Sequence, residues 1–222
     1  MQFKKSLLGF SLVAGIMASG LVLAEKGSIT PTIKSVDVIH NGKPVTITRT
    51  TDKDAVIPKA FSKTSKACPP FCVQPMQAAP GVETVGELEV LGYLQRSSNN
   101  DLSVLVVDSR TPDWVQRGTI PGSVNIPWNQ INHDVEGLFE VEAEAETLDS
   151  ILTKQFGVRI ENGTRDFRNA KTLVLYCNGI WCPQSTANIQ TLAKLGYPAY
   201  KLKWYRGGMQ SWVDVGLTTV KP

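Results

Sequence analysis

The chain has 222 residues, of which 42% are hydrophobic and 19% are charged, and its net charge is +3. This length fits one globular domain with an additional segment. The net charge is small, the basic residues are scattered among acidic ones, and no basic run is interleaved with aromatic residues. These features argue against a nucleic-acid-binding protein.

The first 24 residues have the pattern of a secretory signal peptide. Lys4 and Lys5 precede an apolar stretch over residues 6–22, and the stretch ends in a Val-x-Ala sequence at Ala24. An uncleaved membrane anchor is the alternative, but the small residue at the end favours cleavage. We therefore expect an exported protein, periplasmic or secreted, with no stable membrane span after the signal peptide is removed.

A β-hairpin is predicted near the start of the mature chain. The segments 35–40 and 45–49 alternate in character and are rich in β-branched residues, and Asn41 and Gly42 lie between them. An Asn-Gly pair between two such segments is typical of a type I′ turn. The hairpin belongs to a region, residues 25–80, whose composition differs from that of the remaining chain.

The second half of this region is predicted to be an extended arm. It is rich in Lys, Ser, Pro and Ala, and Pro69, Pro70 and Pro75 exclude a helix. Two cysteines flank the first two of these prolines. The arm either packs along the main domain or brings auxiliary thiols, Cys68 and Cys72, to a reactive loop, and the sequence leaves both interpretations open.

Strands and helices alternate from residue 81 to residue 222, which we predict to form the main domain. The predicted strands are 83–85, 104–107, 124–126, 173–176 and 200–204. The predicted helices are 86–95, a short helix from 111, 147–156, 183–195 and a short helix around Trp212. An acidic run at 140–146 is expected to be a solvated helix start. This alternation favours an α/β fold, a parallel sheet with helices on both faces.

One stretch places a cysteine between a strand and a helix. The apolar run 173–176 predicts a buried strand, Cys177 follows it, and Pro183 suits the first turn of a helix. Open α/β sheets bind ligands at the carboxyl ends of their strands, where loop amides and a helix N-terminus stabilise a thiolate. We therefore interpret Cys177 as a reactive cysteine rather than as a structural one.

The four cysteines lie in two local groups, Cys68 with Cys72 and Cys177 with Cys182. An oxidising compartment permits disulfides, and three full pairings of four cysteines are conceivable. Neither group has the Cys-x-x-Cys spacing of thioredoxin-like or zinc sites, and the chain has only two histidines. We therefore expect no metal and no cofactor, while the pairing of the cysteines stays open.

The order of four motifs resembles the rhodanese-like domain family. The motifs are Val107-Asp-Ser-Arg110, Gly118-Thr-Ile-Pro-Gly-Ser-Val-Asn-Ile-Pro127, Leu175-Tyr-Cys177 and Tyr205-Arg-Gly-Gly-Met-Gln-Ser-Trp212. The resemblance covers about residues 81–222 and implies a parallel α/β sheet. It also implies a set of structural signature residues, which are Asp108, Arg110, Gly207, Gly208 and Trp212.

The resemblance implies a sulfurtransferase that holds sulfane sulfur as a persulfide on the catalytic Cys177. Its partner would be a small sulfur compound or a protein thiol. The substrate-binding loop would consist of Asn178, Gly179, Ile180, Trp181 and Pro183. Because this loop carries no charge, thiosulfate is a doubtful donor. The loop also lacks the arginine with which related phosphatases hold phosphate.

Cys182 lies five positions after Cys177, in the same loop, and leaves alternatives to the family's activity open. It could resolve a persulfide on Cys177, with release of sulfide. The two cysteines could instead form a redox couple for thiol–disulfide exchange. A static disulfide would leave a non-catalytic binding module.

Overall fold

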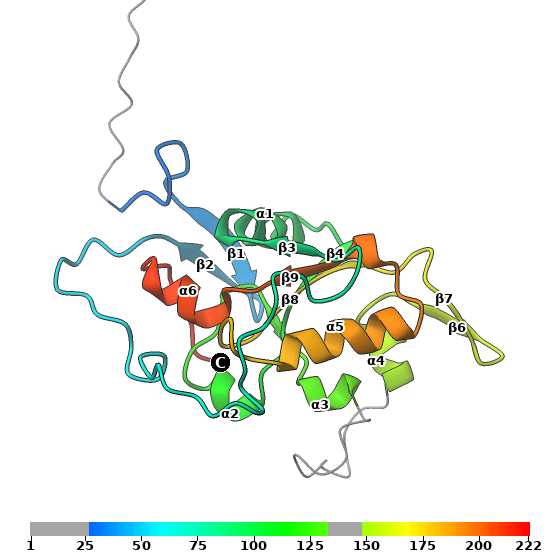
Figure 1. Cartoon of the computed structure of the whole chain (residues 1–222). Helices are drawn as coiled ribbons and strands as arrows, with labels where there is room; N and C mark the ends of the chain where they lie inside the picture. The colour runs from blue at the N-terminus through cyan, green and yellow to red at the C-terminus, as the bar shows by residue number, and fades with distance from the viewer. Residues whose placement is uncertain (1–26, 133–147) are drawn as a thin grey trace, which may run out of the picture.

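The computed structural model describes residues 27–132 and 148–222 (Figure 1). The predicted signal peptide at 1–24 and the acidic run at 140–146 lie outside these ranges. Within them, no helix is long and apolar enough to cross a membrane.

A five-stranded parallel sheet forms the centre of the fold, with the strand order β3-β9-β8-β4-β5. Its strands are β3 Glu83–Val85, β4 Val104–Asp108, β5 Val124–Asn125, β8 Thr172–Tyr176 and β9 Leu202–Tyr205. β8 lies in the middle and pairs with β4 and β9. Since a strand that is covered on both faces is apolar throughout, the run over 173–176 explains why β8 takes this place.

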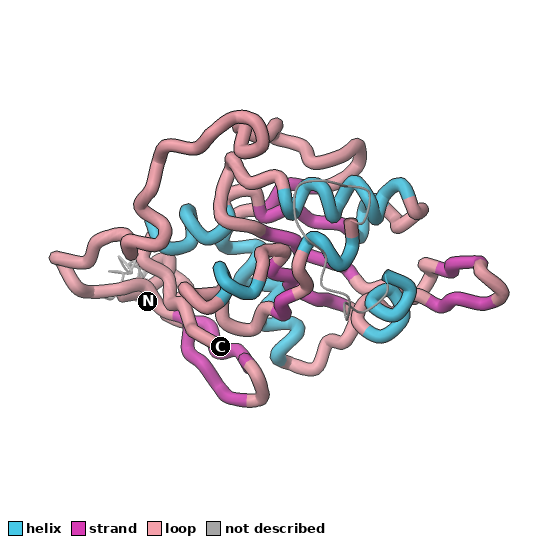
Figure 2. Tube along the Cα trace, turned by 90° about the horizontal axis from the view of Figure 1, so that it is seen from below, coloured by secondary structure: helices cyan, strands magenta, loops and turns pink. Residues whose placement is uncertain are grey.

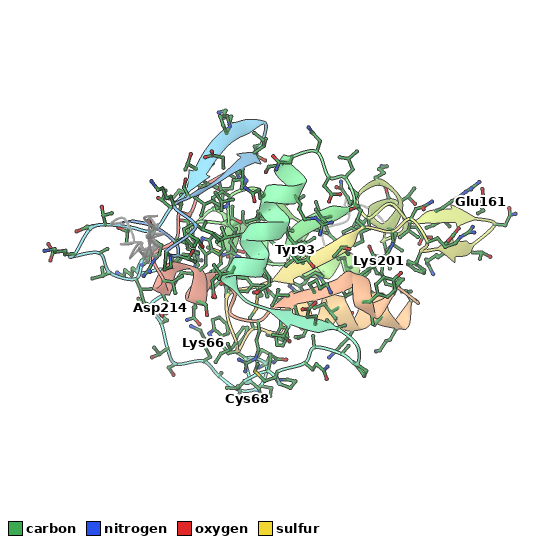
Figure 3. The ribbon with its side chains drawn as sticks, turned by 90° about the horizontal axis from the view of Figure 1, so that it is seen from above. Lys66, Cys68, Tyr93, Glu161, Lys201 and Asp214 are labelled. Carbon is green, nitrogen blue, oxygen red and sulfur yellow. A yellow bond between two sulfur atoms is a disulfide. The ribbon has the colours of Figure 1, made fainter. Side chains whose placement is uncertain are left out.

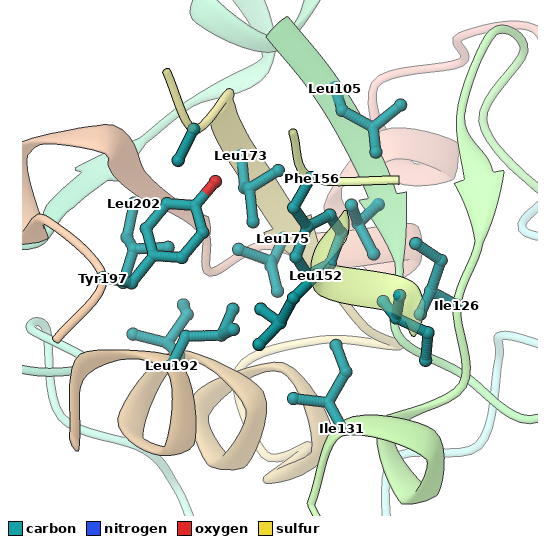
Figure 4. Close-up of a cluster of buried hydrophobic side chains, with 14 of the residues drawn as sticks. Leu105, Ile126, Ile131, Leu152, Phe156, Leu173, Leu175, Leu192, Tyr197 and Leu202 are labelled. Atoms are coloured by element: carbon teal, nitrogen blue, oxygen red, sulfur yellow. The ribbon is translucent and has the colours of Figure 1, made fainter. Parts of the chain in front are cut away.

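Helices cover both faces of the sheet (Figure 1), as the sequence predicted. They are α1 Glu87–Ser98, α2 Pro112–Val115, α3 Trp128–Ile131, α4 Leu148–Lys154, α5 Gln184–Lys194 and α6 Gly208–Asp214. Alternate side chains of β8 enter two separate cores. Leu173 and Leu175 pack in one core with Leu192 of α5 (Figure 4), whereas Val174 and Tyr176 pack with α1 and α6 on the other face.

Some element boundaries differ from the predicted ones. The predicted strand at 200–204 begins as a 3₁₀ turn, Ala199–Lys201, before β9 starts. A second hairpin, β6 Arg159–Glu161 with β7 Thr164–Asp166, was not predicted and projects from the body of the molecule (Figure 2). The sequence carries the signal of this turn, the Asn162-Gly163 pair. Both residues adopt the positive φ that a type I′ turn requires, 48° and 76°.

The N-terminal hairpin has the predicted turn. β1 Val36–His40 pairs antiparallel with β2 Lys43–Ile47. Asn41 and Gly42 between the strands have φ of 48° and 73°, which a type I′ turn requires. The buried side chains of the hairpin join the core below α1, and the Nδ1 atom of His40 accepts a hydrogen bond of 3.1 Å from the amide of Gly122.

Acidification below about pH 6.5 is expected to loosen this hairpin. Burial lowers the pKa of His40 from its usual 6.5, so the unfolded chain binds the proton more readily than the folded one. Stability is therefore lost as pH falls through the unfolded pKa and levels off below the folded pKa. Hydrogen exchange of the β1 and β2 amides, measured from pH 8 to 5, checks this. A His40→Gln variant should show no such pH step, and an identical step in the variant would contradict the assignment.

Candidate active site

The predicted reactive loop lies at the carboxyl end of the central strand. Cys177 directly follows β8, and the loop over 178–183 leads into α5. Cys177 forms a disulfide with Cys182, with a Cα–Cα distance of 6.1 Å, and the two residues are only 2% and 1% exposed. Cys68 and Cys72 form the second disulfide. The sequence left the pairing of the four cysteines open, and in the structure each cysteine is bonded to the other member of its local group.

The first residue of α5 contacts both sulfurs of the loop disulfide. Oε1 of Gln184 lies 3.3 Å from Sγ of Cys177 and 3.6 Å from Sγ of Cys182. A carboxamide can accept a hydrogen bond through its oxygen and donate through its nitrogen. After reduction, Gln184 can therefore contact either a thiol or a thiolate, and the N-terminal end of α5 favours the negatively charged form.

The backbone of α6 holds the loop from the other side. The amide of Met209 donates to the carbonyl of Cys177 at 3.0 Å, and the amide of Gln210 donates to that of Asn178 at 2.9 Å. Gly208 has φ +56°, and a Cβ atom there would overlap the Cys177 carbonyl and lie 2.9 Å from the amide nitrogen of Gly179. Only glycine allows this backbone-to-backbone contact.

A Gly208→Ala variant is expected to lose both stability and the loop geometry. The positive φ costs on the order of 1–3 kcal/mol, and the clash displaces the loop in addition. The matched control is Gly92→Ala in α1, where an added Cβ meets no atom within 4 Å and alanine is the better helix former. Urea unfolding measures both variants. Equal free energies of unfolding for the two would contradict this account of Gly208.

The other signature glycine and tryptophan support α6 rather than the sulfurs. A Cβ at Gly207 would lie 2.5 Å from Oγ of Ser211. Trp212 is fully buried in the core with Tyr205, and its ring N–H donates to the carbonyl of Thr218 at 2.8 Å. These contacts fix the helix whose first amides hold the loop.

Asp108 and Arg110 form a fully buried ion pair behind the loop. The Arg110 guanidinium binds the carboxylate through two contacts, of 2.9 Å and 2.6 Å, and also donates to the carbonyl of Gly118. A further contact of 3.4 Å reaches Oδ1 of Asn178. Burial lowers the pKa of Arg110, the Asp108 carboxylate raises it, and the net shift is upward. The ion pair therefore stabilises the loop through the contact between Arg110 and Asn178.

A pocket of about 760 Å³ opens over the loop. Three parts of the chain line it, namely the arm, the segment around α2, and the reactive loop. Its lining residues are Lys59, Ala60, Lys63, Lys66, Phe71, Thr111, Asp113, Trp114, Arg117, Asn178, Trp181, Cys182 and Gln184. Of the two loop cysteines, only Cys182 lines it.

The structure thus brings three of the predicted site residues together at the pocket, Asn178, Trp181 and Cys182. Gly179, Ile180 and Pro183 do not line it. The residues that sequence reasoning missed are Gln184, the wall around Trp114 and Arg117, and the arm lysines. Only Gln184 had a usable signal, because it directly follows the loop at the predicted helix start.

The arm packs against the reactive loop. The amide of Gln74 donates to the carbonyl of Ile180 at 2.9 Å. The Phe71 ring meets the Trp181 ring edge-on, with 5.6 Å between centroids. The Trp181 ring N–H donates in turn to Oε1 of Gln210 at 2.7 Å. The arm therefore forms one wall of the site, and the role of its cysteines as auxiliary thiols stays a prediction.

The chain is similar to several solved structures. The BH2092 protein from Bacillus halodurans is 18% identical over 63% of this chain and 77% of its own, with a TM-score of 0.42. A rhodanese from E. coli is 21% identical over 54% and 100%, with a TM-score of 0.33. The human single-domain sulfurtransferase TSTD1 is 20% identical over 60% and 96%, with a TM-score of 0.34.

No curated protein matches the chain. The family model described as the rhodanese-like domain matches residues 91–214, more than half of the chain. The matched range contains the buried Asp108–Arg110 pair, the Cys177 loop, and Gly207 and Gly208 at the start of α6. The chain therefore belongs to the rhodanese-like domain family.

Proposed function

We propose that the protein is an exported, periplasmic sulfurtransferase that carries sulfane sulfur as a persulfide on Cys177, with Cys182 as the resolving thiol. The observation that carries the proposal is the position of Cys177, at the end of the central strand and bonded to a second cysteine of the same loop. The predicted signal peptide supports export, and the two local disulfides fit an oxidising compartment.

The cycle begins with reduction of the loop disulfide. Because Cys182 lines the pocket and Cys177 does not, an incoming thiolate attacks Sγ of Cys182. The bond between the cysteines breaks, and Cys177 leaves with the electron pair as a thiolate beside Gln184. A second thiol of the reductant then frees Cys182 and becomes a disulfide with the first.

Sulfur loading follows on the Cys177 thiolate. It attacks the outer sulfur of a persulfide donor, R–S–SH, and the donor's S–S bond breaks with R–S⁻ as the leaving group. Cys177 now carries the outer sulfur as –S–SH. An acceptor thiolate can take this sulfur and restore the Cys177 thiolate, which completes a transfer without net oxidation.

Resolution by Cys182 is the competing route. The Cys182 thiolate attacks Sγ of Cys177, the loop disulfide forms again, and HS⁻ leaves. The outer sulfur is reduced to sulfide while the two cysteines are oxidised, so electrons balance. Resolution requires a second thiol close to Cys177, and Cys182 is close enough because the two residues form a disulfide.

A single-turnover experiment tests the proposal. The reduced protein is mixed with an organic persulfide, and sulfide and loop disulfide are measured together, with Cys182→Ser as the control. We expect one sulfide for each Cys177–Cys182 disulfide that forms, and no such coupled release from the variant. Sulfide release equal to that of buffer alone would contradict the proposal.

The loop disulfide also favours a second candidate, a thiol–disulfide redox protein that uses the same two cysteines. Such a protein would exchange reversibly with dithiols and would gain no sulfur from a persulfide. A binding module with a static disulfide would do neither. A parallel experiment, in which the disulfide form of the protein is mixed with a dithiol and the reduced form with the persulfide, separates these cases.

A further inference from the structure

We propose that the pocket over the reactive loop binds an organic sulfur compound with two or more negatively charged groups, and that the arm supplies most of the positive charge. The proposal rests on the proposed function for the ligand's role as a sulfur donor or acceptor. It names the substrate class, which the uncharged loop over 178–183 leaves undefined.

The charges that line the pocket are strongly unbalanced. Lys59, Lys63 and Lys66 of the arm and Arg117 after α2 face a single carboxylate, Asp113. Asp113 already pairs with Arg117, at 3.6 Å. In the described part of the chain, none of the three lysines forms an ion pair. Uncompensated lysines around a concave surface concentrate anions there.

Two of these cations are held in place by aromatic rings. Nζ of Lys66 lies 4.5 Å from the centre of the Trp181 ring and donates to the carbonyl of Lys63 at 3.1 Å. Cζ of Arg117 lies 4.2 Å from the centre of the Trp114 ring. Such cation–π contacts fix a charge without neutralising it. The arm wall therefore presents positive charge that no carboxylate compensates, whereas the Arg117 charge is shared with Asp113.

The size and the apolar walls argue for an organic ligand. The volume of about 760 Å³ lies in the range of small-molecule sites and far exceeds what an inorganic anion of a few atoms fills. Phe71, Trp114 and Trp181 supply apolar surface for a carbon skeleton. Cys182 and Gln184 line the same pocket, so a ligand whose acidic groups meet the lysines can direct its sulfur toward the loop.

The arm is preorganised for this role. The Cys68–Cys72 disulfide closes a short loop that contains Phe71 and begins two residues after Lys66. Figure 3 shows Lys66 and Cys68 along the arm, well away from Glu161 in the β6–β7 hairpin. Arg206 then binds the carbonyl of Gln74 at 2.8 Å. These contacts lie within the chain itself, and an arm that they fix needs less ordering when a ligand binds.

Direct binding tests the inference with S-methylglutathione, a compound that has two carboxylates and no thiol. Quenching of tryptophan fluorescence gives its affinity for the full mature chain, and its diethyl ester serves as the ligand control. A double variant, Lys63→Glu with Lys66→Glu, removes arm charge. The matched protein control is Lys43→Glu with Lys53→Glu, because both lysines are exposed and neither lines the pocket.

We expect the acid to bind at least about tenfold more tightly than the ester, and the Lys63 and Lys66 variant to lose about tenfold while the control pair does not. Absence of binding, or equal affinity for acid and ester, would overturn the inference. S-methylglutathione cannot transfer sulfur, so its binding is independent of the proposed function. If it binds as expected but the persulfide experiment shows no sulfur transfer, only the proposed function is wrong. If the protein takes up sulfur from persulfides but binds S-methylglutathione and its ester equally, only this inference is wrong.

Discussion

Replacing Cys177 by serine is expected to abolish sulfur loading, whereas replacing Cys182 by serine is expected to leave loading intact and to stop resolution. Only Cys177 follows β8 and lies beside both the first residue of α5 and the first amides of α6. Cys182 contributes the second sulfur of the disulfide. Intact-mass spectrometry of each reduced variant after exposure to an organic persulfide should show one added sulfur for Cys182→Ser and none for Cys177→Ser.

A third variant controls for the remaining cysteines. Cys68→Ser with Cys72→Ser removes the arm disulfide and leaves the loop sulfurs in place. It should still take up one sulfur on Cys177, because the arm thiols carry no sulfur in the proposed cycle. If Cys177→Ser were loaded as fully as the unmodified protein, the assignment of Cys177 would be wrong.

Replacing Arg110 by methionine is expected to destabilise the fold by about 3–5 kcal/mol, because it leaves a buried charge without its partner. Asp108 and Arg110 are both 0% exposed, and the guanidinium binds the carboxylate twice. The loss should extend to the loop, since Arg110 also contacts Asn178. Urea unfolding followed by circular dichroism gives the free energy of unfolding.

The chain offers a matched control for this prediction. Arg168 binds Asp166 two positions earlier with the same forked geometry, at 2.7 Å for the shortest contact, but its side chain is 85% exposed. Arg168→Met should therefore leave the free energy of unfolding almost unchanged. A similar cost for the two variants would show that burial of the Asp108–Arg110 pair does not decide its contribution.

The sheet could be predicted because its strands carry local signals. The apolar run over 173–176 and the helix that follows it place β8 and α5, and the Asn41-Gly42 turn places the first hairpin. The second hairpin was missed although Asn162 and Gly163 carried the same signal. Its strands have only three residues each and little apolar alternation, so periodicity gives no support there.

The candidate site was only partly predictable. Cys177 follows from its place after a buried strand, and the resemblance agrees with it. The pocket does not follow from the sequence, because its charged wall comes from an arm without periodicity. The lysines reach the loop only through contacts distant in sequence, such as the amide of Gln74 with the carbonyl of Ile180. Such docking depends on tertiary packing, on which composition gives no information.

Peptide mapping of the four cysteines shows whether Cys177 carries sulfur or only exchanges with thiols. The unmodified protein is isolated from the periplasm without reductant, then mapped before and after reduction and exposure to an organic persulfide. We expect Cys177–Cys182 and Cys68–Cys72 disulfides before the treatment. Afterwards, we expect either one added sulfur on Cys177, or the Cys177–Cys182 disulfide together with released sulfide. A Cys177 that exchanges only with dithiols and never gains sulfur would contradict the account and favour the redox protein.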